Sequence, residues 1–503
     1  MNGKYNSIPM KRFLLLAGIL FMCALSSCSG GVEEALPAAS QLVFKVNLDK
    51  VGDKADVDQG RIKSELKDFI DHPTPQKLQA LMQHPLLLAA VLEKQAYGFT
   101  TNDYIGLSAA VRDKGMLEDI IGALHTQGAA TQPEPQGGYD WTVYKKQWVI
   151  GYDGSRFLMM GPCPEGAQPA LRQNMLALLH QGRDDSFAAD PAFDKLQDKK
   201  GDLAVYAPLA NLPDLIGGQF ALGVPEKADP ADVQVFLDVE FDKGKIHIDG
   251  ESTSAREDVA AAMQEQARSL PEVKGTFLDR VPQKFLIWGA VGLDGARSLQ
   301  SLKKNRTVSD FLLAMNAGVD ADKIMKSIKG DAAFCVPFLK KNNDVAFLFD
   351  AELAKKDFLN DVGYWKKSVA QIGKGSRMTP AGKNAYNLVM PGLEGRFGVD
   401  GMRFYAANDL RALTLRRGRA AELKPYAGMI RNSVSFTLVN VAEARKIRAF
   451  ADAIRVVGEY VPQVKALVDN TRLIIIRATG GNSGTMDFIA ADRRLNYVQT
   501  LIK

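Results

Sequence analysis

The chain has 503 residues, of which 46% are hydrophobic and 24% are charged, with 63 basic and 58 acidic side chains and a formal charge of +5. This length and apolar content suffice for more than one buried core and argue against long disordered regions. Three basic residues and no acid lie before Cys28, so the rest of the chain is nearly neutral. Nothing in this charge balance suggests a nucleic-acid partner, which would require a strongly basic face.

The first predicted element is a signal peptide, residues 1–27. Lys11 and Arg12 precede the apolar stretch Phe13–Leu25, which has the length of a signal-peptide core and is too short to span a bilayer. The stretch ends in Leu25-Ser26-Ser27-Cys28, which resembles the lipobox of bacterial lipoproteins. The resemblance implies cleavage before Cys28 and a lipid on its sulfur, with acyl chains such as palmitate. The alternative is an ordinary secreted protein that is cleaved nearby.

Residues 28–40 follow the anchor, and we expect them to form a flexible tether because they are mostly small or polar. No later segment reaches 18 apolar residues, so the lipid on Cys28 is the only membrane contact that the sequence predicts. By resemblance to Gram-negative lipoproteins, Ser29 in place of the Asp of an inner-membrane retention signal favours the outer membrane. The periplasmic face and the surface face of that membrane both stay open.

The remaining chain is predicted to consist of two related halves, residues 41–270 and 271–503, because several segments recur in the same order. The matched pairs are Val46–Asp49 with Val291–Asp294, Gly151–Phe157 with Gly398–Phe404, and Leu209–Leu212 with Leu438–Val441. The middle pair reads G-x-D-G-x-R-F in both halves, and its Asp-Gly is typical of a tight hairpin. Alternating strand patterns and amphipathic helices lie between these segments.

These patterns predict an α+β fold in which each half is an antiparallel sheet with helices packed on one face. The first half has extra residues, which we place in the helix-and-loop region Leu171–Lys200. The layout and the paired hairpins resemble a family of Gram-negative envelope lipoproteins of similar length that is known only as a domain of unknown function. The resemblance implies no activity and no catalytic residues.

Aromatic residues gather around the first hairpin: Tyr139, Trp141, Tyr144, Trp148 and Tyr152. The second half has aliphatic residues where Trp141 and Tyr152 match, which indicates core packing at these two positions. It has Gly395 and Pro391 where Trp148 and Tyr144 match, so we keep Tyr144 and Trp148 as a candidate ligand surface. Exposed aromatic faces stack on flat apolar groups such as sugar rings, and this hypothesis requires an exposed Trp148.

Two arginines, Arg156 and Arg403, occupy the same place after the two Asp-Gly pairs. We interpret them as structural groups that bridge to a carboxylate; the alternative is a duplicated contact to an anion. The densest basic run is Arg416, Arg417 and Arg419, which we interpret as a solvated turn.

No metal, cofactor or catalytic group is predicted. Cys163 and Cys335 are isolated from other zinc ligands, and whether they form a disulfide stays open. Gly481-Asn482-Ser483-Gly484 resembles the glycine-flanked serine of some hydrolases, but the matching segment of the first half, residues 242–245, is a plain hairpin turn. The histidines lack the spacing of a metal site; they are His72, His84, His125, His180 and His247.

The sequence therefore favours a lipid-anchored envelope protein that is a non-enzymatic binding or scaffold module. Its partners would be the membrane, through Cys28, and a glycan or an envelope protein. The alternative is a hydrolase that acts on glycan or peptidoglycan, which would need two carboxylates at a defined separation in one cleft.

Overall fold

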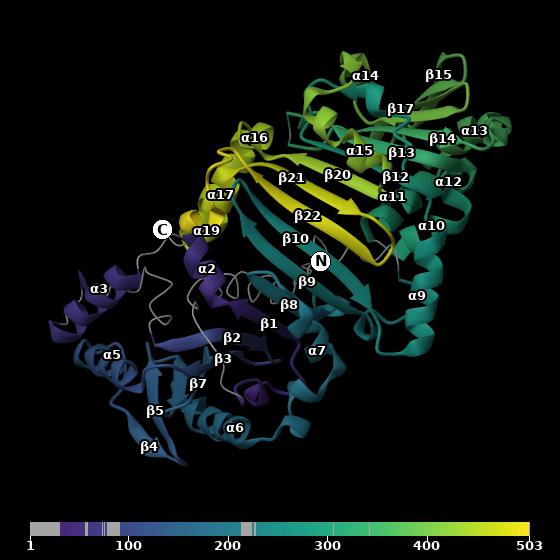
Figure 1. The fold of residues 1–503 in the computed structure, drawn as a ribbon. Helices are drawn as coiled ribbons and strands as arrows, with labels where there is room; N and C mark the ends of the chain where they lie inside the picture. Colours follow the sequence, from purple (N-terminus) through teal and green to yellow (C-terminus); the bar gives the residue numbers. More distant parts are fainter. Residues whose placement is uncertain are drawn as a thin grey trace.

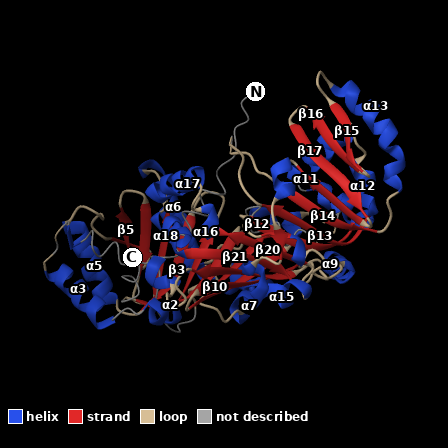
Figure 2. Cartoon of the chain, turned by 90° about the horizontal axis from the view of Figure 1, so that it is seen from above, coloured by secondary structure: helices blue, strands red, loops and turns tan. Residues whose placement is uncertain are grey.

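The computed structural model describes residues 31–501, except residues 56–58, 73, 75, 78–90, 213–223, 226–227, 305 and 342. The predicted signal peptide and Cys28 lie outside the described residues, as does His84. The molecule is elongated, with α3 and α5 at one end and α13 at the other (Figures 1 and 2). Within the described ranges, none of the helices is both long enough and apolar enough to cross a bilayer.

Twenty strands form one continuous antiparallel sheet. The first half contributes β1 (Leu42–Asn47), β2 (Leu92–Thr100), β3 (Ile105–Val111), β4 (Glu134–Gln136), β5 (Tyr139–Tyr144), β6 (Trp148–Tyr152), β7 (Arg156–Gly161), β8 (Leu203–Pro208), β9 (Gln234–Asp242) and β10 (Lys245–Thr253). The second half contributes β12 (Ile287–Asp294), β13 (Ile328–Val336), β14 (Leu348–Leu353), β15 (Arg377–Gly382), β16 (Ala385–Met390), β17 (Leu393–Asp400), β18 (Arg403–Ala407), β20 (Ser435–Asn440), β21 (Thr471–Ala478) and β22 (Ser483–Ala490). A separate two-stranded ribbon pairs β11 (Val281–Pro282) with β19 (Arg417–Gly418).

Helices lie between the strands. In the first half they are α2 (Leu48–Ala55), α3 (Gln59–Asp71), α5 (Lys114–Thr126), α6 (Gln168–His180), α7 (Pro191–Asp198) and α9 (Glu257–Ser269). In the second half they are α10 (Gly295–Lys304), α11 (Arg306–Asn316), α12 (Ala321–Ser327), α13 (Val362–Ile372), α14 (Leu410–Thr414), α15 (Ala427–Arg431), α16 (Val441–Ala444), α17 (Arg448–Tyr460), α18 (Pro462–Asn470) and α19 (Tyr497–Leu501). The predicted α+β class with an antiparallel sheet is confirmed.

The two halves have the same strand order. Hydrogen bonding runs β4-β5-β6-β7-β3-β2-β1-β8-β9-β10 in the first half. It runs β15-β16-β17-β18-β14-β13-β12-β20-β21-β22 in the second. A row of directly opposed residues, Val46–Ala96–Ala109–Phe157, recurs as Val291–Ala332–Ala351–Phe404. The origin of this correspondence by duplication stays a prediction.

One of the matched segments is shifted. Val43 pairs with Tyr206, and Trp288, at the corresponding place in β12, pairs with Leu438. Tyr206 therefore corresponds to Leu438, and the match of Leu209 with Leu438 is wrong by three residues. Leu209 lies in the short 3-10 turn that follows β8, so its resemblance to the strand sequence of β20 is accidental.

Helices cover both faces of the first half, so the expectation of helices on one face is wrong there. Phe157 and Met159 of β7 pack in one apolar cluster with α5, whereas Leu158 and Met160 pack in a second cluster with α6. Every residue of β3 is buried. The residues that alternate with its larger side chains are Gly, Ser and Ala, and their small volume lets a second layer approach the sheet.

Residues 31–40 are not a flexible tether, so this part of the prediction for residues 28–40 is wrong. Val32 is 6% exposed and Leu36 is fully buried, and they flank a short 3-10 helix, η1 (Glu33–Ala35). The Ser108 hydroxyl donates to the Val32 carbonyl at 2.7 Å, and the Phe187 amide donates to the Leu36 carbonyl at 3.0 Å. The burial of Val32 and Leu36 fixes the segment in place, although most of its other residues are small or polar.

The same arrangement precedes the second half. The 3-10 helix η9 (Leu278–Arg280) stands before β12 as η1 stands before β1. The linker that carries η9 is fixed by Asp331, a residue of β13 that is 1% exposed. Its carboxylate accepts the backbone N–H groups of Lys274, Gly275 and Thr276 at 2.7–2.8 Å. A packed lead-in segment thus precedes the first strand of each half, and in the first half it comprises residues 31–40.

The halves meet where β10 pairs with β22, in the long diagonal strands at the centre of Figure 1. His247 lies directly opposite Asp487 in this ladder, and their Nδ1 and Oδ1 atoms are 2.6 Å apart. The other ring nitrogen of His247 is 3.2 Å from Oδ2 of Asp249. The C-terminal α19 adds to the joint because Val498 packs in the core of the first half.

Burial lowers the pKa of His247, but the hydrogen bond with Asp487 and the charges of Asp487 and Asp249 outweigh it, so the pKa lies above its ordinary value of 6.5. Lys245 opposes this rise, and Glu240 stands opposite His247 on β9. A raised pKa means that the folded state binds the proton more tightly than the unfolded chain. The stabilisation is complete below pH 6.5 and is lost as the pH rises through the folded pKa.

We expect His247→Gln to remove this component of the pH dependence, because glutamine carries no proton to release. The free energy of unfolding, measured by chemical denaturation at a series of pH values from below 6.5 upward, should fall less steeply than in the wild type. The exposed His180 offers the control His180→Gln, which should keep the wild-type slope. An unchanged slope in His247→Gln contradicts the assignment.

A second prediction concerns the stability that the lead-in segment of the first half, residues 31–40, contributes. Leu36→Ala should lower the free energy of unfolding by about 2–5 kcal/mol, since it leaves a cavity under a fully buried side chain. The matched control is Leu313→Ala, at a leucine that is 73% exposed, which should stay within about 0.5 kcal/mol of the wild type. Equal small effects of both changes would mean that residues 31–40 are a free tether after all.

Candidate functional site

The candidate aromatic residues lie opposite each other. Tyr144 and Trp148 form the last pair of the β5–β6 ladder, and both are half-buried against the core of the first half. Trp148 packs over Gly161, where an added Cβ would come within 2.8 Å of the ring. Burial raises the pKa of Tyr144 to about 12. The side chains of Tyr144 and Trp148 are thus partly exposed to solvent, and a ligand-binding role for them stays a prediction.

The pairing corrects the match behind this choice. Trp141 pairs with Gly151, whereas Gly398, the counterpart of Gly151, pairs with Ala385. Trp141 therefore corresponds to Ala385 and not to Leu388. By the same reasoning, Leu388, which stands opposite Gly395, corresponds to Tyr144. Trp141 is nonetheless fully buried and Tyr152 is 1% exposed, as expected for core residues.

Both matched arginines bridge to carboxylates, as the structural interpretation predicts. Arg156 lies 3.5 Å from Glu34 of the lead-in segment and donates to the Leu179 carbonyl at 2.6 Å. Arg403 lies 3.5 Å from Asp350, a residue of β14 that is 7% exposed. The expectation of a solvated turn is wrong for Arg417, because this residue is also 3.5 Å from Asp350.

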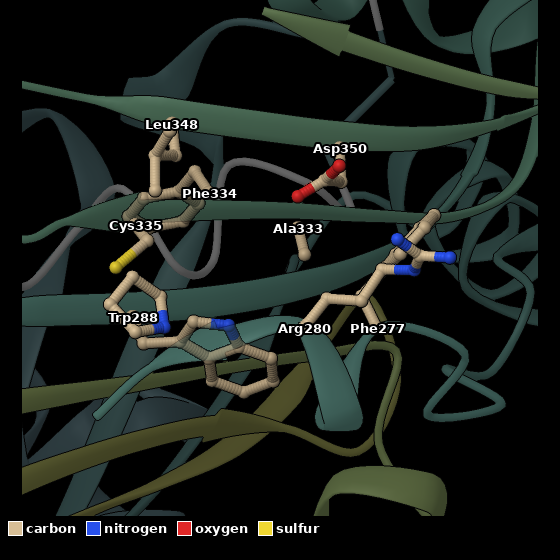
Figure 3. A pocket seen from close by; sticks show the side chains of 9 residues that line it. Phe277, Arg280, Trp288, Ala333, Phe334, Cys335, Leu348 and Asp350 are labelled. Carbon is tan, nitrogen blue, oxygen red and sulfur yellow. The ribbon is translucent and has the colours of Figure 1, made fainter. Parts of the chain in front are cut away.

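A small cavity adjoins this charged cluster (Figure 3). Trp288, Phe334, Cys335 and Leu348 lie toward one side of it, and Arg280 and Asp350 toward the other. Its volume is about 10 Å³, which is space for about one water molecule and for no larger ligand. Burial raises the pKa of Cys335 to about 12, so the thiol stays protonated and unreactive at neutral pH.

The buried carboxylate of Asp350 forms ion pairs with two arginines, Arg403 and Arg417. Burial raises its pKa, while Arg417, Arg403 and Arg280 act in the opposite direction. Asp350 thereby ties β14 to β18 and, through Arg417, to the β11–β19 ribbon that holds the linker. Apart from Asp350, the lining residues with a charged or thiol side chain are Arg280 and Cys335.

A larger and more open groove lies on the first half. It is lined by Pro37, Thr101, Asp103, Tyr104, Met160, Leu171, Asn174, Ala177 and Leu178, and its volume is about 350 Å³. This size is that of an ordinary ligand pocket. Pro37 comes from the lead-in segment, Met160 from β7 and Leu171 from α6, so the groove lies where these three elements meet.

Most of the groove lining is apolar. Leu171 is fully buried and Met160 is 3% exposed, and burial raises the pKa of Tyr104. Asp103 is the only charged residue among the lining side chains. Among its lining residues the groove therefore has one carboxylate, Asp103, and no cation for an anionic ligand. It is suited to bind an apolar group.

A buried lysine was not anticipated from the sequence. Lys45 of β1 is 8% exposed, and desolvation lowers its pKa to about 8 although Asp238 and Asp198 act against this. Its Nζ donates to the carbonyls of Gln197 and Lys199 at 2.7 and 2.8 Å. A lysine with a lowered pKa can be a nucleophile, but these two hydrogen bonds hold the amine inside the fold, where it connects β1 to the end of α7.

Within the described ranges, no three His, Cys, Asp or Glu side chains lie close enough together to hold an ion. Cys163 and Cys335 are both free and buried, so the open question of a disulfide between them is answered in the negative.

Comparisons with known proteins add a family but no activity. The model of a family described as "Domain of unknown function (DUF4836)" matches residues 32–427. No curated protein matches the chain. Among solved structures, crystal forms I, IV and III of TP0453 match with a TM-score of 0.27 each and 9%, 9% and 8% identity. They cover 48%, 44% and 47% of this chain and 86%, 79% and 86% of that chain. A likeness at this TM-score carries no information about function.

The structural role of Asp350 can be tested by substituting it and, as a control, the nearby Asp400. Asp350→Asn should lower the free energy of unfolding by about 3 kcal/mol, because it leaves two largely buried guanidinium groups without their carboxylate. Asp400 also pairs with Arg403, at 3.6 Å, but its side chain is 70% exposed. Asp400→Asn is therefore the control and should change stability by less than about 0.5 kcal/mol in chemical denaturation. Similar effects of the two changes would argue against the buried bridge.

Proposed function

The chain belongs to the family described as Domain of unknown function (DUF4836), and on this premise we propose that it is a non-enzymatic binding or scaffold module of the bacterial envelope, anchored by lipid on Cys28. The observation that carries the binding role is the open groove of the first half, which is apolar and has a single charged lining residue, Asp103. Such a lining favours binding over catalysis.

The anchor and the groove are close along the chain. Pro37 lines the groove, and Cys28 precedes it by only nine residues. The lipobox-like Leu25-Ser26-Ser27-Cys28 supports lipid on the cysteine, and Ser29 supports the outer membrane as its location. A partner in the envelope, either a glycan or another protein, fits this placement.

The alternative function, hydrolysis of a glycan or peptidoglycan, finds little support. Hydrolases of this kind place two carboxylates within about 10 Å in one cleft. The cavity beside Asp350 and the groove beside Asp103 each have one carboxylate among their lining residues. No observation in the described part of the chain favours the hydrolase over the binding module.

The anchor can be tested by Cys28→Ser in the full chain. We expect the N-terminal peptide of the wild type to carry the mass of a diacylglycerol-modified cysteine, and the variant to lose this mass and leave the detergent phase in phase partition. Cys23→Ser, in the part of the signal peptide that is removed, is the matched control and should leave lipidation intact. An unmodified Cys28, or cleavage at another position, would overturn the proposed anchor.

A further inference from the structure

The groove of the first half lies beside the segment that leads to the anchoring cysteine. We propose that one acyl chain of the lipid on Cys28 lies in this groove. The inference rests on the proposed lipidation and adds to it a binding site on the protein for part of its own anchor. The occupant is thus an alkyl chain that is covalently attached to the same molecule.

The lead-in segment fixes where the lipid begins. Gly31 packs against Arg156, whose guanidinium would come within 2.6 Å of an added Cβ, and the next residue, Val32, is held by the hydroxyl of Ser108. Two residues separate Gly31 from Cys28. Since consecutive Cα atoms are 3.8 Å apart, the cysteine lies within about 11 Å of Gly31. The acyl chains therefore start close to the body of the protein.

Hydrogen bonds and a β-bridge hold the segment between Gly31 and the groove. The Gln181 amide donates to the Leu36 carbonyl at 3.2 Å, and Pro37 forms a bridge with Ser186. These contacts hold the lead-in segment along the C-terminal end of α6, whose Leu178 lines the groove. Arg156 joins the same two elements, since it contacts Glu34 and the Leu179 carbonyl.

The chemistry of the groove fits an alkyl chain better than a polar ligand. Five of its nine lining residues are apolar, namely Pro37, Met160, Leu171, Ala177 and Leu178, and Thr101, Asp103 and Asn174 are the polar ones beside Tyr104. No lysine, arginine or histidine is among the lining residues, so a phosphate or carboxylate would find no counter-charge. Burial of apolar surface is the interaction that such a lining can offer.

The protein should stay attached to the membrane when one of its acyl chains leaves the bilayer. A single acyl chain holds a protein to a membrane only marginally, whereas two or more hold it stably. The lipid predicted for Cys28 has two acyl chains on its glycerol and usually a third on the amino group. One chain can therefore lie in the groove while the others stay in the membrane, and the groove would then face the bilayer.

The test uses a palmitate analogue with a diazirine at its end, which cells attach to the full chain. After irradiation of intact cells, trypsin digestion and mass spectrometry, we expect crosslinks to peptide 173–183 of α6, which contains Ala177 and Leu178. Label on Cys28 that crosslinks only to phospholipid would overturn the inference. Absence of the label from the protein would instead overturn the proposed lipidation, so the two failures are distinguishable.

Two variants probe the groove and one controls for them. Leu178→Glu places a charge in the lining, and Ala177→Trp fills the groove without a charge; each should lower the crosslink yield at least fivefold. Leu313→Glu, at an exposed leucine of α11, should leave the yield unchanged. Thermal unfolding checks that each variant is folded. A yield that is unaffected by both groove variants, or equally reduced by the control, would contradict an acyl chain in the groove.

Discussion

The pairing of β10 with β22 is the interaction on which the architecture depends. A half that ended at β10 would present a row of unpaired N–H and C=O groups, which is a site for aggregation. The corresponding strand of the second half satisfies these groups, and the two sheets become one. His247 and Asp487 add a charge pair at the centre of the ladder, and α19 carries the last residues of the chain back onto the first half. The joint therefore makes one continuous sheet from two similar sets of strands.

Much of the fold was predictable from local patterns. The hairpins around Asp153 and Asp400 and the strand–helix succession of each half follow from alternation, helical periodicity and turn residues, and they are confirmed. Three features were not predictable in this way. The burial of Val32 and Leu36 depends on partners far along the chain, and the helices on both faces of the first half depend on the small side chains of β3. The match of Leu209 with Leu438 failed because the turn after β8 happens to resemble a strand in sequence.

The site was less accessible to sequence reasoning than the fold. The groove takes its lining from the lead-in segment, the β2–β3 turn, β7 and α6, which only the tertiary structure brings together. The bridge of Asp350 to Arg403 and Arg417 was missed in part because its partners lie on separate elements, and the arginine run was taken for a solvated turn. The membership in a family of unknown function was anticipated. It brings no residue with an assigned role, so the binding role rests on the chemistry of the groove.

The strand order has one more consequence, at the two ends of the sheet. With β10 and β22 paired to each other, the free edges are β4 and β15, which occupy the same place in the two halves. Each contains a proline, Pro135 in β4 and Pro380 in β15, and a β-bulge follows Pro380. Proline cannot donate a ladder hydrogen bond. Both ends of a sheet of twenty strands thus carry a residue that disfavours further strand addition, and such addition is the route by which crowded copies of a protein polymerise edge to edge.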